Sequence, residues 1–389
     1  MKPVLSFAAA LLALVGASSQ AQTSQGVSKN EIVLGSIQDL SGPIAGFGKQ
    51  VRQGMLLRVD ELNEQGGING RKIRLLIEDS AYDPKKAVLA AQKLVNQDKI
   101  FAMVAHIGTP TNNAAMPVQF EKNVINFFPV TAAREMTEPV HKLKFAGGSS
   151  YYDQMRVALP RLIKDKGAKK ICTIYQDDEF GLEVFRGAEA GLKAVGMDFA
   201  EKTTYKRGAT DFSSQVARMK AANCDLVVLG TIIRETIGTI AEGRKTGFNP
   251  AYLGSSATYT DLIHKLGKKA MDGLYATHTV QHPYMDEVSP KIAFWAKKYQ
   301  TKFGDDPTVF SVYGYSAIDT FIQAAQKAGP NLSTDSFIKA MESLTFPPDM
   351  FGSAELTFGP AKRAGSNMTR MSQLQDERWK PVTEYVKPQ

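Results

Sequence analysis

The stretch KICTIYQDDEFGLEVFRGAEAGLKAVGMDFAEKTTY, residues 170–205, decides the fold class. It opens with a run of mostly β-branched and aromatic residues at 170–176, which predicts a strand. Apolar residues then recur at helical spacing over 181–195, and a second strand-like run follows at 199–205. A strand, a helix and a strand in this order predict a βαβ unit whose two strands are parallel.

The same alternation continues on both sides of this stretch. It covers residues 31–148, and after a linker-like Gly-Gly-Ser-Ser at 147–150 it resumes and runs to 277. The predicted strands are 31–37, 72–78, 101–105, 124–128, 170–176, 199–205 and 225–230, and the predicted helices are 47–65, 84–96, 152–166, 181–195, 212–222 and 234–247. Two such units imply an α/β protein with two doubly wound parallel sheets, each covered by helices on both faces.

The last third of the chain, 278–389, has too few predicted strands for a third unit. We expect helices at 290–302 and 315–328, a short strand at 355–358 and a strand pair within 368–385. This segment is therefore expected to return and complete both units.

Composition and charge match an ordinary globular protein. The chain has 389 residues, of which 43% are hydrophobic and 22% charged, and its formal net charge is +8. These values exclude a disordered or collagen-like chain, and the length suggests two domains. Basic and acidic residues are interspersed, without the aromatic and basic pattern of RNA-binding domains, so we expect no nucleic-acid partner.

The first residues predict export. Lys2 precedes an apolar run at 4–17, and small residues stand three and one positions before a cut after Ala21. This pattern is typical of a signal peptide, residues 1–21, and the apolar run is shorter than the ~20 residues that span a bilayer. No cysteine lies near the cut, so we expect a periplasmic protein without a lipid anchor.

The two cysteines, Cys172 and Cys224, each stand near the start of a predicted strand. An oxidising compartment allows one disulfide between them. We nevertheless expect two buried free thiols, with the disulfide as the alternative. Nothing around either cysteine indicates a catalytic thiol.

Motifs for catalysis or cofactor binding do not appear in the sequence, neither a G-x-G-x-x-G, nor a Walker loop, nor a G-x-S-x-G. His278 and His282 have the spacing of zinc ligands on a helix, but their segment is β-branched and ends at Pro283. An extended chain would hold the two side chains ~13 Å apart, too far to share a metal. The acidic cluster at 177–179 is expected to be solvated. We expect no enzyme, no metal and no cofactor.

The loops after the strands of the first unit carry candidate ligand groups. Doubly wound sheets bind ligands at the carboxyl ends of their strands, where helices begin. Here those loops are 41–48, 106–112 and 128–133, and they are rich in small and hydroxyl-bearing residues. Hydroxyls and backbone N–H groups at a helix start favour a carboxylate or another small anion. Phe47, between two glycines, is either an aromatic wall of such a site or a core residue.

In these loops the sequence resembles the leucine/isoleucine/valine-type periplasmic solute-binding proteins that feed ABC importers. The resemblance runs from about residue 31 to the end. Its segments are LSGPIA at 40–45, GGING at 66–70, DP at 83–84 with Ala87, FG at 180–181 and TDF at 210–212. Each segment alone is a weak signal, but their order and spacing are specific.

The resemblance implies the type I periplasmic-binding-protein fold, with two doubly wound parallel-sheet lobes joined by a three-crossing hinge. The ligand is then expected in the cleft between the lobes. We place the N-terminal lobe at 30–147 plus 280–357 and the C-terminal lobe at 148–279 plus 358–389. The crossings are expected near 146–150, 278–282 and 356–360.

The resemblance also implies site residues, position by position. Thr109 matches the hydroxyl residue that binds the ligand carboxylate. Thr131 and Ala132 match a pair that contacts ammonium and carboxylate, with Ala132 in place of the family's threonine. The other matches are the pocket aromatics Phe47, Phe180 and Phe310, and Ile232, which stands where amino-acid binders place a tyrosine.

One departure from the resemblance concerns the ligand. Amino-acid binders carry an acidic residue for the α-ammonium where this chain has Ser256, and a buried ammonium without that partner would be poorly compensated. Arg234 either adds a cation at the site or is a solvated residue at a helix start. We expect a ligand that keeps its carboxylate but lacks the α-amine, such as a branched or aromatic acid. In a true branched-chain amino-acid receptor, the alternative, Asp261 or Tyr259 would cover the ammonium.

These features predict an exported, non-catalytic and monomeric receptor. It is expected to close two lobes on a small carboxylate solute and to deliver it to the membrane permease of an ABC importer. A ligand-sensing regulator or receptor domain on the same fold is the alternative from another class.

Overall fold

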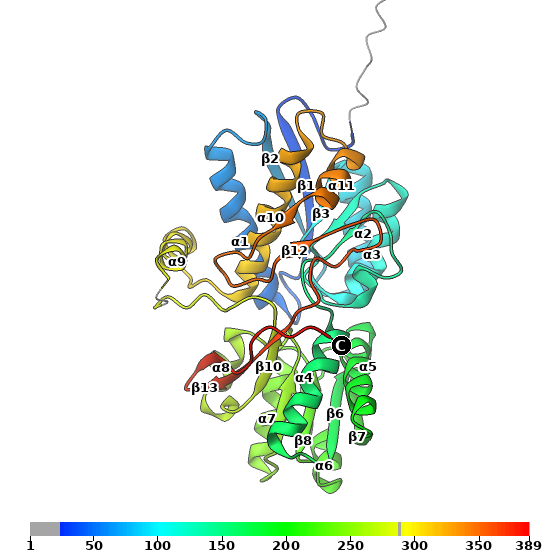
Figure 1. Ribbon diagram of the computed structural model, residues 1–389, viewed down its shortest axis with the longest axis vertical. Coiled ribbons are helices and arrows are strands. Elements are labelled where there is room, and N and C mark those ends of the chain that lie inside the picture. The colour runs from blue at the N-terminus through cyan, green and yellow to red at the C-terminus, as the bar shows by residue number, and fades with distance from the viewer. Residues whose placement is uncertain (1–23, 287–288, 389) are drawn as a thin grey trace, which may run out of the picture.

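The computed structural model describes residues 24–286 and 289–388, which form two lobes of sheet and helix (Figure 1). The predicted signal peptide, residues 1–21, lies outside the described residues. Each lobe is built around one main sheet, and the chain passes between the two sheets after β5, after β10 and after β12.

The first lobe holds a parallel sheet of five strands in the order β2-β1-β3-β4-β5. Its strands are β1 (Glu31–Gln38), β2 (Lys72–Asp79), β3 (Ala102–Val104), β4 (Ile125–Phe127) and β5 (Lys144–Phe145). Its first helices are α1 (Ala45–Glu64), α2 (Pro84–Gln92), which a π-helical turn continues to Gln97, and α3 (Thr109–Glu121). Side chains of β1 alternate between the faces: Ile32 and Leu34 pack on the side of α1, and Val33 and Ile37 on the side of α2.

The second lobe holds a sheet of seven strands in the order β14-β13-β10-β9-β8-β6-β7. Its parallel strands are β6 (Ile171–Gln176), β7 (Phe199–Tyr205), β8 (Leu226–Gly230), β9 (Ala251–Gly254) and β10 (Tyr275–His278). Its helices are α4 (Tyr151–Lys166), α5 (Glu179–Ala194), α6 (Ser213–Ala221), α7 (Arg234–Lys245) and α8 (Asp261–Gly267). The predicted strand, helix and strand at 170–205 are thus β6, α5 and β7.

The last third of the chain serves both lobes. Its helices are α9 (Pro290–Phe303), α10 (Val309–Ala328) and α11 (Thr334–Ser343), and a small antiparallel pair joins β11 (Thr345–Phe346) to β12 (Leu356–Thr357). Helix α10 packs against α1 in the first lobe, where no Cβ fits between Gly54 and the backbone of Ser311. The chain then adds β13 (Arg370–Gln375) and β14 (Arg378–Pro381) as an antiparallel edge to the second sheet.

Helix α10 begins at Val309, six residues earlier than the sequence predicted. Thr308 and Ser311 form a capping box: the Thr308 Oγ1 accepts from the Ser311 N–H at 3.2 Å, and the Ser311 Oγ accepts from the Thr308 N–H at 2.7 Å. This cap extends the helix down to the interface between the lobes, which matters for the site described below.

The connecting stretches are hydrogen-bonded to one another. The N–H of Ala146 donates to the carbonyl of Arg363 at 2.9 Å, and the N–H of Gln281 donates to the carbonyl of Phe351 at 2.8 Å. The C-terminal segment runs between the lobes (Figure 1), and its Tyr385 hydroxyl donates to the carbonyl of Thr279 at 2.7 Å.

The expectation of two free thiols is wrong, because Cys172 and Cys224 form a disulfide with their Cα atoms 5.9 Å apart. The strand order explains the pairing. β6 lies between β7 and β8, and Ile171 of β6 pairs in register with Leu226 of β8. Sequence spacing alone does not reveal that the first and third strands of this lobe are neighbours.

Candidate functional site

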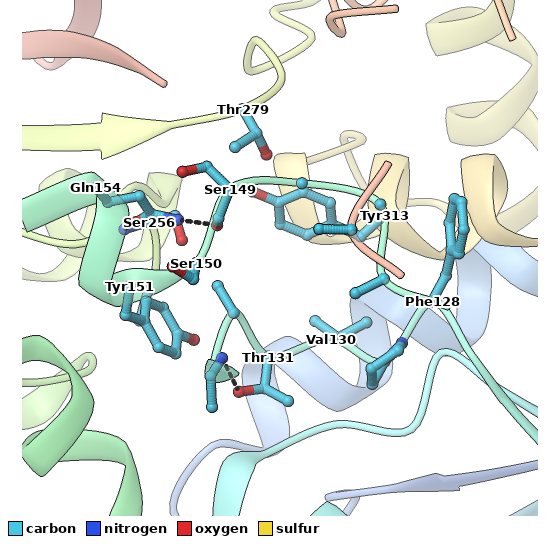
Figure 2. Close-up of a pocket in the computed structure, with 18 of the residues that line it drawn as sticks. Phe128, Val130, Thr131, Ser149, Ser150, Tyr151, Gln154, Ser256, Thr279 and Tyr313 are labelled. Atoms are coloured by element: carbon cyan, nitrogen blue, oxygen red, sulfur yellow. Dashed lines mark hydrogen bonds between the residues drawn. The ribbon is translucent and has the colours of Figure 1, made fainter. Parts of the chain in front are cut away.

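The carboxyl ends of the two parallel sheets face a cavity of about 250 Å³ between the lobes. It is lined by loops of both lobes and by the connecting stretches (Figure 2). The predicted site residues that line it are Phe47, Thr109, Thr131, Ala132, Phe180, Ile232, Ser256 and Phe310. Residues far apart in sequence therefore meet at one place, where doubly wound folds bind ligands.

One end of the cavity is suited to an anion. Helix α3 starts there with Thr109, and no side chain caps its N-terminus. The Oγ1 atoms of Thr109 and Thr131 lie 2.6 Å apart, so both hydroxyls reach the same spot in front of the helix. An uncapped helix start with two hydroxyls provides donors for a carboxylate.

The loop before α3 needs glycine at its turn. Gly108 has a φ of +94°, and a Cβ there would lie 2.6 Å from the Tyr82 ring and 2.7 Å from the Thr111 Oγ1. A side chain at this position would push Thr109 away from the cavity.

Aromatic and aliphatic side chains form the apolar wall. The rings of Phe47 and Phe310 are stacked, 3.7 Å between centroids, and Phe180 packs edge-on against Tyr151 at 5.2 Å. Phe47 is 2% exposed and also belongs to the hydrophobic core, so it is both a wall of the cavity and a core residue. The wall suits an aliphatic or aromatic ligand body.

The first connecting stretch contributes polar groups that the sequence did not reveal. Ser149, Ser150 and Tyr151 face the loop of Val130 and Thr131 across the open space in Figure 2. The Ser149 Oγ is buried and has no hydrogen-bond partner within the described residues. Burial raises the pKa of Tyr151, so its hydroxyl stays protonated and able to donate. A Gly-Gly-Ser-Ser composition is typical of a linker, and only the fold shows that this stretch lines the cavity.

Ser256 is held by a buried amide. The Gln154 Oε1 accepts from the Ser256 N–H and from the Thr277 Oγ1, both at 2.9 Å. The Nε2 of Gln154 donates to the carbonyl of Ser149 at 2.8 Å, so one side chain links the Ser256 loop to the connecting stretch. The side chain that Ser256 presents to the cavity is neutral.

Tyr259 and Asp261, the two residues that could contact a ligand ammonium in place of an acid at position 256, point away from the cavity. Tyr259 stacks on His278 at 4.2 Å, and its hydroxyl accepts from the His282 N–H at 3.1 Å. Asp261 is buried and paired with Lys265 at 2.8 Å. Neither residue lines the cavity.

Arg234 does not line the cavity either. It is the first residue of α7, its side chain is exposed, and the neighbouring Ile232 takes the place at the cavity. Among the described residues that line the cavity, the one cation is Arg134.

Arg134 joins the two lobes. Its Nε and Nη2 donate to the two carboxylate oxygens of Glu183 on α5, at 2.9 and 2.8 Å. The Glu183 side chain is 2% exposed and that of Arg134 is 29% exposed. Burial acts to raise the pKa of Glu183, but the hydrogen bonds from Arg134 outweigh it and the pKa lies below its ordinary value.

A second contact between the lobes involves Tyr82. Its carbonyl accepts from the Arg207 Nη1 at 2.9 Å, and its hydroxyl accepts from the Gln176 Nε2 at 3.3 Å. The lobes are therefore in contact across the cavity, as in a closed clamp.

A family model described as periplasmic binding protein matches residues 31–377, most of the chain. The chain belongs to this family.

Relatives of this periplasmic binding protein have different ligands in their names. The Leu/Ile/Val-binding protein of Escherichia coli (strain K12) is 25% identical over 307 residues, which is 78% of this chain and 80% of that protein. The fatty acid ABC transporter substrate-binding protein from Thermomonospora curvata has a TM-score of 0.86 at 23% identity, covering 94% of this chain and 95% of that chain. A solute-binding protein from R. palustris in complex with benzoate has a TM-score of 0.80 at 16% identity, covering 92% and 98%. These likenesses support the two-lobe fold predicted from the sequence.

Within the part of this periplasmic binding protein that the structure describes, no cluster of side chains could hold a metal ion. His278 instead ends β10, and its ring hydrogen-bonds to the Ser372 Oγ at 2.8 Å and to the Val280 carbonyl at 3.0 Å. None of the described helices has the length and apolar character needed to cross a membrane.

Proposed function

We propose that this chain is the solute receptor of an ABC importer and that it closes its lobes on a small acid without an α-amine. Thr109, Thr131 and the start of α3 hold the carboxylate, and Phe47, Phe180, Ile232 and Phe310 surround the rest of the ligand. The receptor is exported to the periplasm, performs no catalysis and hands the solute to a membrane permease. Closure, stabilised by the contact of Arg134 with Glu183, is the change that the permease reads.

The observation that carries this proposal is the neutral wall at Ser256. An α-ammonium enclosed beside Ser256 would lose its hydration without gaining a carboxylate partner from the Ser256 loop, because Tyr259 and Asp261 are engaged elsewhere. The names of similar proteins support this proposal: chains of similar fold are named for benzoate and for fatty acids, and a relative in sequence is named for branched-chain amino acids.

Titration calorimetry with matched ligands tests the proposal. We expect 4-methylpentanoate, which is leucine without its amine, to bind at least about tenfold more tightly than leucine, and benzoate or phenylacetate to bind measurably. The amide of 4-methylpentanoate is the control for the carboxylate and should bind more weakly. Tight binding of leucine with weak binding of 4-methylpentanoate would make the chain a branched-chain amino-acid receptor instead.

A further inference from the structure

The cavity continues beyond the groups that surround the proposed carboxylate site. Helix α10 lines it with Phe310, Tyr313, Ser316 and Thr320, spaced three, three and four residues apart. This spacing places the four side chains on one face of the helix. Ten residues of α-helix rise by about 15 Å. Because these residues line one cavity, the cavity extends along α10, a helix that lies in the first lobe (Figure 1).

We call the part of the cavity that is lined by Ser316, Thr320, Ser353, Leu356 and Ser366 the extension. Phe128 and Tyr313 lie at its entrance, on the opposite side of the open space from Tyr151 (Figure 2). The connecting stretch passes close to Phe128, since a Cβ on Gly147 would lie 3.2 Å from that ring. The backbone of Gly147 and the ring of Phe128 thus pack together at the border of the extension.

Two hydroxyls of the extension, those of Ser353 and Ser366, are available as donors, whereas the Ser316 hydroxyl donates to Asp349 at 3.4 Å. The Ser353 Oγ accepts from the Asp349 N–H at 3.0 Å, and the Ser366 Oγ accepts from the Met368 N–H at 3.1 Å. A serine whose oxygen accepts a hydrogen bond still has its own hydrogen to donate. These groups therefore favour a ligand atom that accepts a hydrogen bond.

A second anionic group on the ligand would find no free cation here. Arg134 is the cation among the described residues that line the cavity, and Glu183 holds it with two hydrogen bonds. Asp349, which also lines the extension, carries negative charge itself. Beyond Phe128 and Tyr313, the extension therefore offers hydroxyls and one carboxylate, and no cation among the described residues that line it.

We propose that the extension is a subsite for the tail of an elongated acid whose far end carries a neutral acceptor, such as a hydroxyl or an amide. This inference rests on the proposed function, because the carboxylate of the same molecule is held at Thr109 and Thr131. The ligand class is then a long ω-substituted monocarboxylic acid, not a compact amino acid.

Calorimetry with three acids tests the subsite. Hexanoate is short enough to occupy only the part of the cavity around Thr109 and Thr131, which we call the main chamber. 12-Hydroxydodecanoate has a chain about as long as the row of α10 side chains from Phe310 to Thr320. Dodecanedioate has the same chain length but ends in a second carboxylate. We expect 12-hydroxydodecanoate to bind about tenfold or more tightly than hexanoate and than dodecanedioate. Equal binding of hexanoate and 12-hydroxydodecanoate overturns the subsite and leaves the proposed function intact, whereas failure of all three acids overturns both.

A variant locates the effect in the extension. Ser316→Phe fills the space beside α10, and we expect it to remove the tenfold advantage of 12-hydroxydodecanoate over hexanoate. Hexanoate then also reports whether the main chamber is still formed. Gln323→Phe is the matched control, because Gln323 lies exposed on the same helix and does not line the cavity. An unchanged ratio of the two affinities in Ser316→Phe overturns the subsite.

Discussion

Under the proposed function, the side chain at position 256 decides between two classes of ligand. The backbone N–H of Ser256 is fixed by Gln154, and its side chain reaches the cavity at 9% exposure, so a longer side chain here would also face the ligand. Thr109 and Thr131 contribute hydroxyls whatever the ligand carries on its α-carbon. Charge at position 256 is therefore the variable that separates amino acids from simple acids.

Ser256→Glu should change the ligand preference from acids without an amine to amino acids. We expect the affinity for leucine to rise about tenfold or more, because a buried carboxylate pairs with the α-ammonium, and the affinity for 4-methylpentanoate to fall through repulsion of its carboxylate. Calorimetry with both ligands measures the change. Ser256→Gln has the same shape without the charge, and it should not gain leucine binding. Identical results for the two variants would show that size and not charge acts at this position.

Sequence reasoning located much of the cavity at the scale of residues but not all of it. Thr109 and Phe180 follow strands at helix starts, and such positions are readable from periodicity and motif spacing. Ser149 and Tyr151 were not predicted, because their place depends on how the connecting stretch returns to the cavity. Arg234 was proposed for the site from its place near the carboxyl end of the strand at 225–230, but its side chain is exposed and does not line the cavity.

At the scale of elements, the disulfide between Cys172 and Cys224 ties the starts of β6 and β8. The cavity lies at the other, carboxyl ends of these strands. The double variant Cys172→Ala, Cys224→Ala should lower the free energy of unfolding by about 2–4 kcal/mol, since the bridge restrains the unfolded chain. Chemical denaturation measures this loss, and calorimetry should find ligand affinity changed less than about twofold. A large loss of affinity would contradict the separation of bridge and site.

Element boundaries were predictable where capping and turn residues mark them. Asp83 accepts a hydrogen bond from the Lys86 N–H at 2.9 Å and starts α2 before Pro84, as the sequence indicated. The start of α10 was missed because Thr308 and Ser311 form a capping box in which serine takes the role usually given to glutamate or glutamine. Strand order, which joins the cysteines, is a tertiary property that no local pattern contains.

At the scale of the whole molecule, closure depends on few contacts between the lobes. The pair of Arg134 and Glu183 joins the lobes through a buried acid. Arg186 contacts the same carboxylate at 3.6 Å, but it lies on α5 with Glu183 and does not join the lobes, and its side chain is 52% exposed. An exposed pair contributes little, whereas hydrogen bonds to a buried charge contribute more.

Glu183→Gln should weaken ligand binding roughly tenfold at pH 7, because the closed state loses its charge-assisted contact. The pKa of Glu183 is lowered in the closed form, so its contribution is present above its ordinary pKa and is lost as the pH falls through the lowered value. The ratio of the Kd values of variant and wild type should therefore approach one as the pH falls through the lowered pKa of Glu183. The carboxylate of the ligand titrates equally in both proteins and cancels from the ratio.

Arg186→Gln is the control for this prediction, and its affinity should stay within about twofold of the wild type. A ratio for Glu183→Gln that is constant from neutral to acidic pH would show that the ion pair does not govern closure.

The order in which the chain is made has a consequence for how the lobes form. The core of the second lobe, from β6 to β10, is one continuous segment, whereas α1 of the first lobe packs against α10 near the other end of the sequence. The apolar face of α1 thus stays uncovered until α10 has been synthesised. The lobe whose synthesis begins first is therefore the lobe that is completed last.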